Sequence, residues 1–193
     1  MNEFEVVGKP LARLDSSSKA RGKAQYLEDI RLPGILQAKI LVSPLPHARI
    51  RNIDISRAKA LPGVKAVITG QDLPPIKWGN VPHGKDQYTL AIGKVRHVGD
   101  AVAAVAAIDE ETAEEAINLI RVDYENLPAV FDPEEAIKPG APLVHEDRES
   151  NIHSRVIKTF GDIERGFKES YYIREDRYST VTSNNAALEP HSV

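Results

Sequence analysis

The chain contains no cysteine among its 193 residues. Disulfide frameworks are therefore excluded, and this polypeptide cannot hold an iron–sulfur cluster or a cysteine-type zinc site. If the protein works with such a cluster, a different polypeptide must carry it. No apolar run approaches the roughly 20 residues that a membrane helix needs. The cytoplasm is the compartment we expect, and no membrane partner is predicted.

An excess of positive charge is also missing. The 28 acidic and 25 basic residues give a formal net charge of −3, which offers no attractive field for nucleic acid or an anionic membrane. Glycine-rich phosphate loops and G-x-S-x-G nucleophile motifs are absent from the sequence. Hydrophobic content of 41% and charged content of 27% are ordinary for a globular protein.

Hydrophobic patterning predicts a mixed α/β (α+β) fold. A helix over 110–119 follows the cap residue Asp109 and carries an apolar stripe, and a shorter helix over 56–61 can be capped by Ser56. The run 101–108 fits either a helix or a strand by spacing, but its eight-residue length favours a buried strand. The other predicted strands cover 35–42, 49–55, 64–68, 95–98 and 120–125.

Two stretches lack this periodicity. Residues 71–93 read either as a surface excursion or as a partner-bound segment, and 129–150 as an extended, proline-containing connection. A second unit follows, with strands expected at 156–160 and 173–181 around a helix that starts at Gly161-Asp162. Residues 185–193 read as the interior of a fold, so we expect a piece of a larger enzyme with exposed apolar surface over 173–193.

Candidate ligands are few. None of the six histidines is paired at the i, i+4 spacing of a helical zinc site. The densest cluster, His145-Glu146-Asp147, favours a solvated group over a metal site, and a zinc enzyme built on His145, Glu146 and His153 is the remote alternative. His191 is read as a structural histidine. By themselves these residues support no named reaction.

A set of short motifs, in order between Gly8 and His191, carries a family resemblance. They are Gly22-Lys23-Ala24-Gln25-Tyr26 with Asp29, Ser43-Pro44-Leu45-Pro46-His47-Ala48-Arg49-Ile50, Pro62-Gly63-Val64, Gly70-Gln71-Asp72-Leu73, Val98-Gly99-Asp100-Ala101-Val102, the segment 120–128, Gly161-Asp162 and Leu188-Glu189-Pro190. Together they resemble the molybdopterin-binding large subunits of the xanthine dehydrogenase and aldehyde oxidase family. Among its members, the 4-hydroxybenzoyl-CoA reductases (alpha subunit) resemble the chain most. Ala101 departs from the family pattern, which usually has proline there.

The resemblance implies a domain organisation. It predicts an N-terminal lead-in over 1–18, an α/β hammerhead domain over 19–131, an extended connection over 132–149 and the incomplete start of a molybdopterin-binding domain over 150–193. It implies molybdenum on molybdopterin in the complete enzyme, [2Fe–2S] clusters on a small partner subunit and, in many members, FAD on another. The family's pterin-contacting loop and catalytic glutamate have no counterpart within the 193 residues, so we assign no catalytic, cofactor-binding or metal residue.

What remains resembles a platform that packs against the iron–sulfur subunit and the remainder of the molybdopterin-binding subunit in a hetero-oligomer. Contacts with a partner are predicted at Ser43, Pro44, His47, Arg49, Gly99 and Asp100. The resemblance therefore predicts part of a molybdenum hydroxylase or dehydrogenase that is inactive alone. The alternative is a non-catalytic hammerhead module for assembly or interaction.

Overall fold

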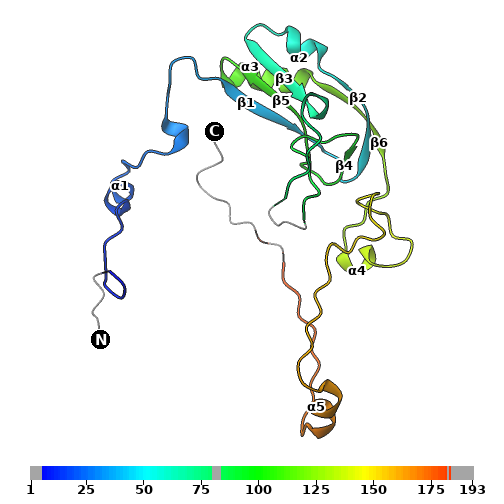
Figure 1. Ribbon diagram of the computed structural model, residues 1–193. Coiled ribbons are helices and arrows are strands. Elements are labelled where there is room, and N and C mark those ends of the chain that lie inside the picture. The colour runs from blue at the N-terminus through cyan, green and yellow to red at the C-terminus, as the bar shows by residue number, and fades with distance from the viewer. Residues whose placement is uncertain (1–5, 80–83, 182, 184–193) are drawn as a thin grey trace. The chain divides into compact units, whose positions relative to one another are not determined.

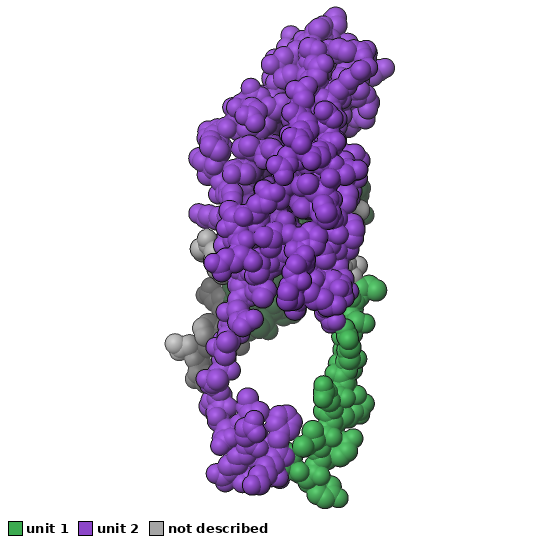
Figure 2. All heavy atoms as spheres, turned by 90° about the vertical axis from the view of Figure 1, so that its right-hand side faces the viewer, with its two compact units in different colours: residues 1–33, 170–193 green, residues 34–169 purple. Residues whose placement is uncertain are grey.

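A computed structural model describes residues 6–79, 84–181 and 183. The chain divides into two units, residues 1–33 with 170–193 and residues 34–169 (Figure 2). The first contains a short helix, α1 (Ser16–Ala20), and a 3₁₀ turn, η1 (Leu27–Asp29). The second holds both sheets and all the remaining helices (Figure 1). Within the described residues, no helix is long and apolar enough to cross a membrane.

The first sheet of the 34–169 unit has the order β1-β5-β3 and is antiparallel throughout. Its strands are β1 (Gln37–Val42), β5 (Ala101–Ala107) and β3 (Val64–Thr69). The ambiguous apolar run is therefore a strand, and it takes the central position. Helices α2 (Ser56–Ala60) and α3 (Glu110–Leu119) pack on one face of this sheet, and their alanines Ala58, Ala113 and Ala116 are fully buried. Small side chains at these contacts let the helices approach the strands closely.

The second sheet has the order β4-β2-β6. It is formed by β4 (Lys94–Val95), β2 (Ala48–Asp54) and β6 (Arg121–Asn126), again antiparallel. A small core of Ala48, Ala91, Val95 and Val102 joins the second sheet to β5. This core holds β4 beside the start of β2, which is where the candidate site lies.

Local chemistry explains the best-predicted element. The Asp109 carboxylate accepts the Thr112 N–H at 2.8 Å, and Glu110 and Glu111 occupy the first turn of α3. These acids sit at the positive end of the helix dipole. The predicted bounds 110–119 are confirmed. Ser56, in contrast, is not the cap of α2: it is the first helical residue, and Asp54 accepts its N–H at 2.9 Å.

Three predicted strands differ from the structure. β4 ends at Val95, because the Arg96 N–H is taken by the Asp100 carboxylate at 2.9 Å and the chain then turns. The strands predicted over 156–160 and 173–181 are wrong, since neither segment joins a sheet and both are exposed. A strand needs a neighbouring strand for its backbone groups, and neither segment has one among the described residues. Between them, α5 (Ile163–Glu169) forms as predicted.

The connection that follows β6 contains one short helix, α4 (Pro133–Ala136), which Asp132 caps by accepting the N–H groups of Glu134 and Glu135. In the segment predicted to expose apolar surface, Ile173, Tyr178 and Val181 are 56%, 84% and 89% exposed. Residues 182 and 184–193, including His191 and Leu188-Glu189-Pro190, lie outside the described residues.

Candidate functional site

A corner between two connections gathers half of the predicted partner-contact residues. The Ser43 N–H donates to the Asp100 carbonyl at 2.8 Å, and the Gly99 N–H donates to the Ser43 carbonyl at 2.8 Å. The Ser43 hydroxyl also donates to Leu45 O at 2.9 Å. Ser43 is only 1% exposed, and its backbone N–H and carbonyl fasten the β1–β2 connection to the turn before β5. Gly99 makes that turn with a φ of 93°, which glycine adopts readily.

His47 belongs to the same corner but faces the end of β6. Its Nδ1 bonds the Pro128 carbonyl, and Leu127 N–H donates to the His47 carbonyl at 3.0 Å. Because a carbonyl oxygen only accepts, Nδ1 carries the proton in this hydrogen bond. Nε2 is buried and has no hydrogen-bond partner among the described residues. Pro44 and Arg49 are exposed. The contact role of these residues stays a prediction.

A pocket of about 330 Å³ opens beside His47. Its walls are mainly apolar and come from four segments of the chain, represented by Pro46, Val98, Phe131 and Val144. Val98 is 61% exposed and Phe131 is 81% exposed. Arg96 and His97 add polar edges to this lining. The pocket can accept an apolar side chain, but it offers no constellation that would perform chemistry.

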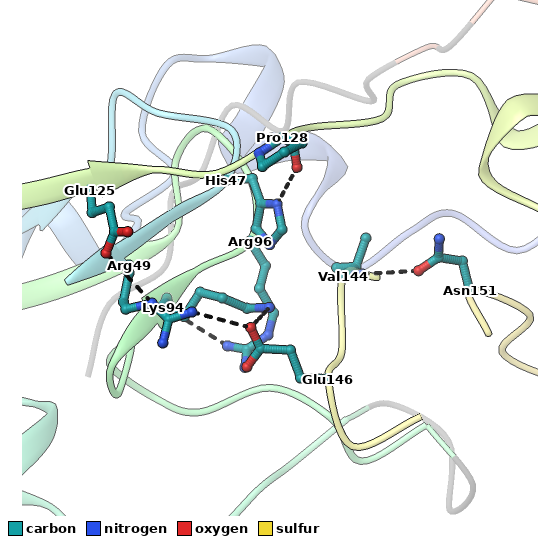
Figure 3. Close-up of polar contacts among 9 residues, drawn as sticks. All are labelled: His47, Arg49, Lys94, Arg96, Glu125, Pro128, Val144, Glu146 and Asn151. Atoms are coloured by element: carbon teal, nitrogen blue, oxygen red, sulfur yellow. Dashed lines mark hydrogen bonds and ion pairs between the residues drawn. The ribbon is translucent and has the colours of Figure 1, made fainter. Parts of the chain in front are cut away.

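Next to the pocket, a lysine is buried under a carboxylate (Figure 3). Lys94 is 5% exposed, and its Nζ lies 3.4 Å from Oε1 of Glu146, long for a charge-assisted hydrogen bond. Burial lowers the pKa of Lys94, and the nearby Arg96 guanidinium acts in the same direction while Glu146 opposes it. Arg49 reaches both acids of the site, at 3.9 Å from Glu146 and 3.7 Å from Glu125. Sequence reasoning missed Lys94, because a lysine beside a glycine gives no sign that it will be buried.

The His145-Glu146-Asp147 triplet does not converge on one point. Its three side chains pair with three different segments: His145 with Asp86 at 3.7 Å, Glu146 with Lys94, and Asp147 with Lys77 at 2.8 Å. We call this arrangement the clasp, because it fastens the connection after β6 to the hammerhead strands and loops. Within the described ranges, no three histidine or carboxylate side chains gather as a metal site would require.

Burial and neighbouring charges shift the pKa values of two clasp residues, His145 and Asp147. Burial lowers the pKa of His145, Arg96 lowers it further, and Asp86 and Asp147 oppose the shift. The pKa of the Asp147 carboxyl is lowered by its hydrogen bond from Lys77. The neutral imidazole and the ionised carboxylate are thus the favoured forms at neutral pH. The sequence indicated a solvated cluster. It did not show that each of the three side chains pairs with a distant residue.

A single amide closes the loop that carries the clasp. Asn151 accepts the Val144 N–H at 2.9 Å and donates to the carbonyls of Ala136 and Pro142 at 3.0 and 2.9 Å. The side chain therefore ties together three points of a proline-containing loop that forms no sheet. Asn151 gave no signal in the sequence, because an asparagine in a loop is common and its partners are 7 to 15 residues away.

The molybdenum cofactor implied by the resemblance does not fit these residues. The pocket is lined mainly by apolar side chains, and the Lys77–Asp147 and Lys94–Glu146 charges are engaged in internal pairs. We therefore derive no chemical step from this part of the molecule. The arrangement holds one segment against another and presents a pocket.

Comparison with known proteins decides the family. Residues 21–128, more than half of the chain, match the model of the "Aldehyde oxidase and xanthine dehydrogenase, a/b hammerhead domain". The chain belongs to the xanthine dehydrogenase and aldehyde oxidase family. The match lies within the range 19–131 that we predicted for the hammerhead.

Individual family members agree. A probable xanthine dehydrogenase subunit of Bacillus subtilis is 41% identical over 186 residues, 95% of this chain and 24% of that protein. The nicotinate dehydrogenase large molybdopterin subunit of Eubacterium barkeri is 35% identical over 189 residues, 97% of this chain and 44% of that protein. In quinoline 2-oxidoreductase from Pseudomonas putida 86, a region 34% identical superimposes with a TM-score of 0.70, covering 83% of this chain and 21% of that one.

The chain thus spans between about a quarter and under half of the length of these relatives. It has the family's mixed α/β hammerhead fold. The corner, the pocket and the clasp all lie inside or directly after the matched region.

Proposed function

We propose that this chain is the N-terminal part of the molybdenum-binding large subunit of a xanthine dehydrogenase family oxidoreductase. Its role there is that of a scaffold and docking platform. The observation that carries the proposal is the 41% identity, along 95% of the chain, to a Bacillus subtilis protein of which the match covers only 24%. The described polar clusters support a holding role, because their charges are used to fix the connection after β6.

The proposed complete enzyme binds molybdenum on molybdopterin through the remainder of the large subunit. A small subunit with [2Fe–2S] clusters, and an FAD subunit where one is present, complete a hetero-oligomer in the cytoplasm. The reaction class is hydroxylation or reductive dehydroxylation of an aromatic, heterocyclic or acyl-CoA substrate, with 4-hydroxybenzoyl-CoA reductase as the member we favour. The six residues Ser43, Pro44, His47, Arg49, Gly99 and Asp100 are our candidates for contacts with the iron–sulfur subunit. Ser43 and His47 are buried, so they would act by positioning the exposed residues beside them.

The test is purification of the tagged chain alone and after co-expression with the missing large-subunit segment and the small subunit. We expect no stoichiometric molybdenum on the chain alone, and molybdenum, iron and both partners in the co-expressed sample. Stoichiometric molybdenum on the isolated chain would mean that the site is misplaced. A stable, soluble monomer that captures neither partner would favour the non-catalytic assembly module instead.

A further inference from the structure

The sheet formed by β1, β5 and β3 has two faces of different character. Strand register places Ala38, Ala106 and Ala66 side by side in one row, and Ile40, Ala104 and Ile68 in the next. Residues directly opposite one another in antiparallel strands point to the same face. We call these six residues the outer face. The residues that alternate with them, such as Val67, Ala103 and Val105, point to the opposite face under α2 and α3.

Burial confirms the difference. Val67, Ala103 and Val105 are at most 4% exposed beneath the helices. On the outer face, Ile40 is 58% exposed, Ala38 and Ala66 are exposed, and the other three residues are half-buried. Within the 34–169 unit, α2 and α3 both pack on the other side of this sheet (Figure 1).

The polar pattern of β1 is the reverse of what a solvent-facing sheet requires. An antiparallel sheet with one wet face normally alternates apolar residues inward with polar residues outward. Here Lys39 lies on the helix side, where its Nζ pairs with Glu110 at 2.8 Å and Glu114 at 3.6 Å. Ile40 and Ala38 point outward instead. Neither row of the outer face contains a polar or charged side chain, which is unusual for surface that stays in water.

We propose that the remainder of the large subunit packs on the outer face as a further layer of structure. This inference rests on the proposed function and adds the surface through which that function is carried out. The relatives supply the occupant: in the Bacillus subtilis protein, the matched region is 24% of a polypeptide whose other segments have no counterpart here. A face without any charged group is typical of a permanent contact, since transient subunit interfaces keep the mixed composition of ordinary surface.

The shape of the face specifies the chemistry of the occupant. Four of the six residues are alanines, so the face is shallow and has no large side chains except at Ile40 and Ile68. A helix or strand with leucine, isoleucine or phenylalanine side chains would pack against this face, because large residues pack well against small ones. The charged corner near Lys94 and Arg49 is a different kind of surface, suited to a polar partner.

The experiment uses the tagged 193-residue chain, co-expressed with the part of the Bacillus subtilis relative that lies outside the matched region. The test variant is Ile40→Lys, since lysine on an edge strand is well tolerated in water but not in an apolar contact. The matched control is Ile76→Lys, at an apolar side chain 70% exposed outside both sheets. Ile40→Leu serves as the conservative variant.

We expect Ile40→Lys to lower capture of the co-expressed segment by about tenfold or more, and the other two variants to stay within about twofold of the unmodified chain. Circular dichroism of each chain alone should show the same secondary structure, which separates lost docking from lost folding. Capture by Ile40→Lys equal to that of the unmodified chain would overturn the inference and leave the proposed function standing. No capture by the unmodified chain would overturn both. A dimer of the isolated chain that Ile40→Lys alone converts to monomer, without capture, would assign the face to a second copy and also overturn the inference.

Discussion

Replacement of Lys94 by methionine tests how the buried charge affects stability. Lys94 is 5% exposed, and its nearest carboxylate belongs to Glu146, whose side chain is 62% exposed. Burial lowers the lysine pKa, which means that the folded chain disfavours the ammonium relative to the unfolded chain. A pKa lowered by folding contributes stability only above the unfolded value of about 10.5, so at neutral pH the charge opposes folding.

The magnitude follows from comparing two variants. Lys94→Met keeps most of the apolar stem and removes the charge, so the free energy of unfolding should stay equal or rise by about 1 kcal/mol. Lys94→Ala removes the stem as well and leaves a cavity, at about 0.8 kcal/mol for each lost methylene, so stability should fall by about 2 kcal/mol. Urea unfolding followed by circular dichroism at neutral pH measures both.

The control is Glu146→Gln, which leaves the buried ammonium without its nearest carboxylate. Because Glu146 is largely exposed, the loss should be only about 1 kcal/mol, and it should disappear in the Lys94→Met background. The reasoning would be refuted if Lys94→Met were less stable than the unmodified chain by more than about 1 kcal/mol. Such a result would mean that the ion pair outweighs the desolvation of the lysine.

Three further changes probe the clasp and the core. Asn151→Ala removes three hydrogen bonds and should lower stability by about 2 kcal/mol and speed proteolysis within 136–151, with Asn118→Ala, at an exposed helix position, as the control. Gly70→Ala would place a Cβ 2.6 Å from the Ala91 carbonyl oxygen, so a loss of roughly 2 kcal/mol is expected by thermal unfolding; an unchanged midpoint would contradict this packing. Folding lowers the pKa of His145, so its contribution to stability is present above the unfolded value of 6.5 and is lost as the pH falls. The urea concentration at the unfolding midpoint should therefore be lower at pH 5.5 than at pH 7, and His145→Gln should reduce this difference.

Local signals explain which parts of the fold could be predicted. The α3 bounds were readable because Asp109 and the acids after it act within one turn of the chain. The assignment of 101–108 as a strand succeeded, with β5 covering Ala101–Ala107, because eight residues are short for a helix. The strand predicted at 173–181 failed because residue composition does not provide the neighbouring strand that it must pair with.

The candidate site was harder to predict for the same reason. Lys77 and Asp147 form their ion pair across 70 residues, and the sequence gives no measure of which distant acid a lysine will meet. The burial of Lys94 was equally unreadable, since lysine is usually exposed. The motif around Ser43 and Gly99 was recognisable from the family resemblance, but the hydrogen bonds that explain it required the structure.

The placement of polar and apolar groups in the described residues agrees with the proposed platform role. A site that performs chemistry directs several polar groups at one point, where a substrate would lie. In the described residues the most suggestive polar triplet, His145-Glu146-Asp147, is instead paired group by group with Asp86, Lys94 and Lys77. The surface that the described helices leave uncovered is the apolar outer face around Ile40. Because burial of apolar surface drives association, an exposed apolar sheet beside internally paired charges supports the proposal that more protein joins this chain.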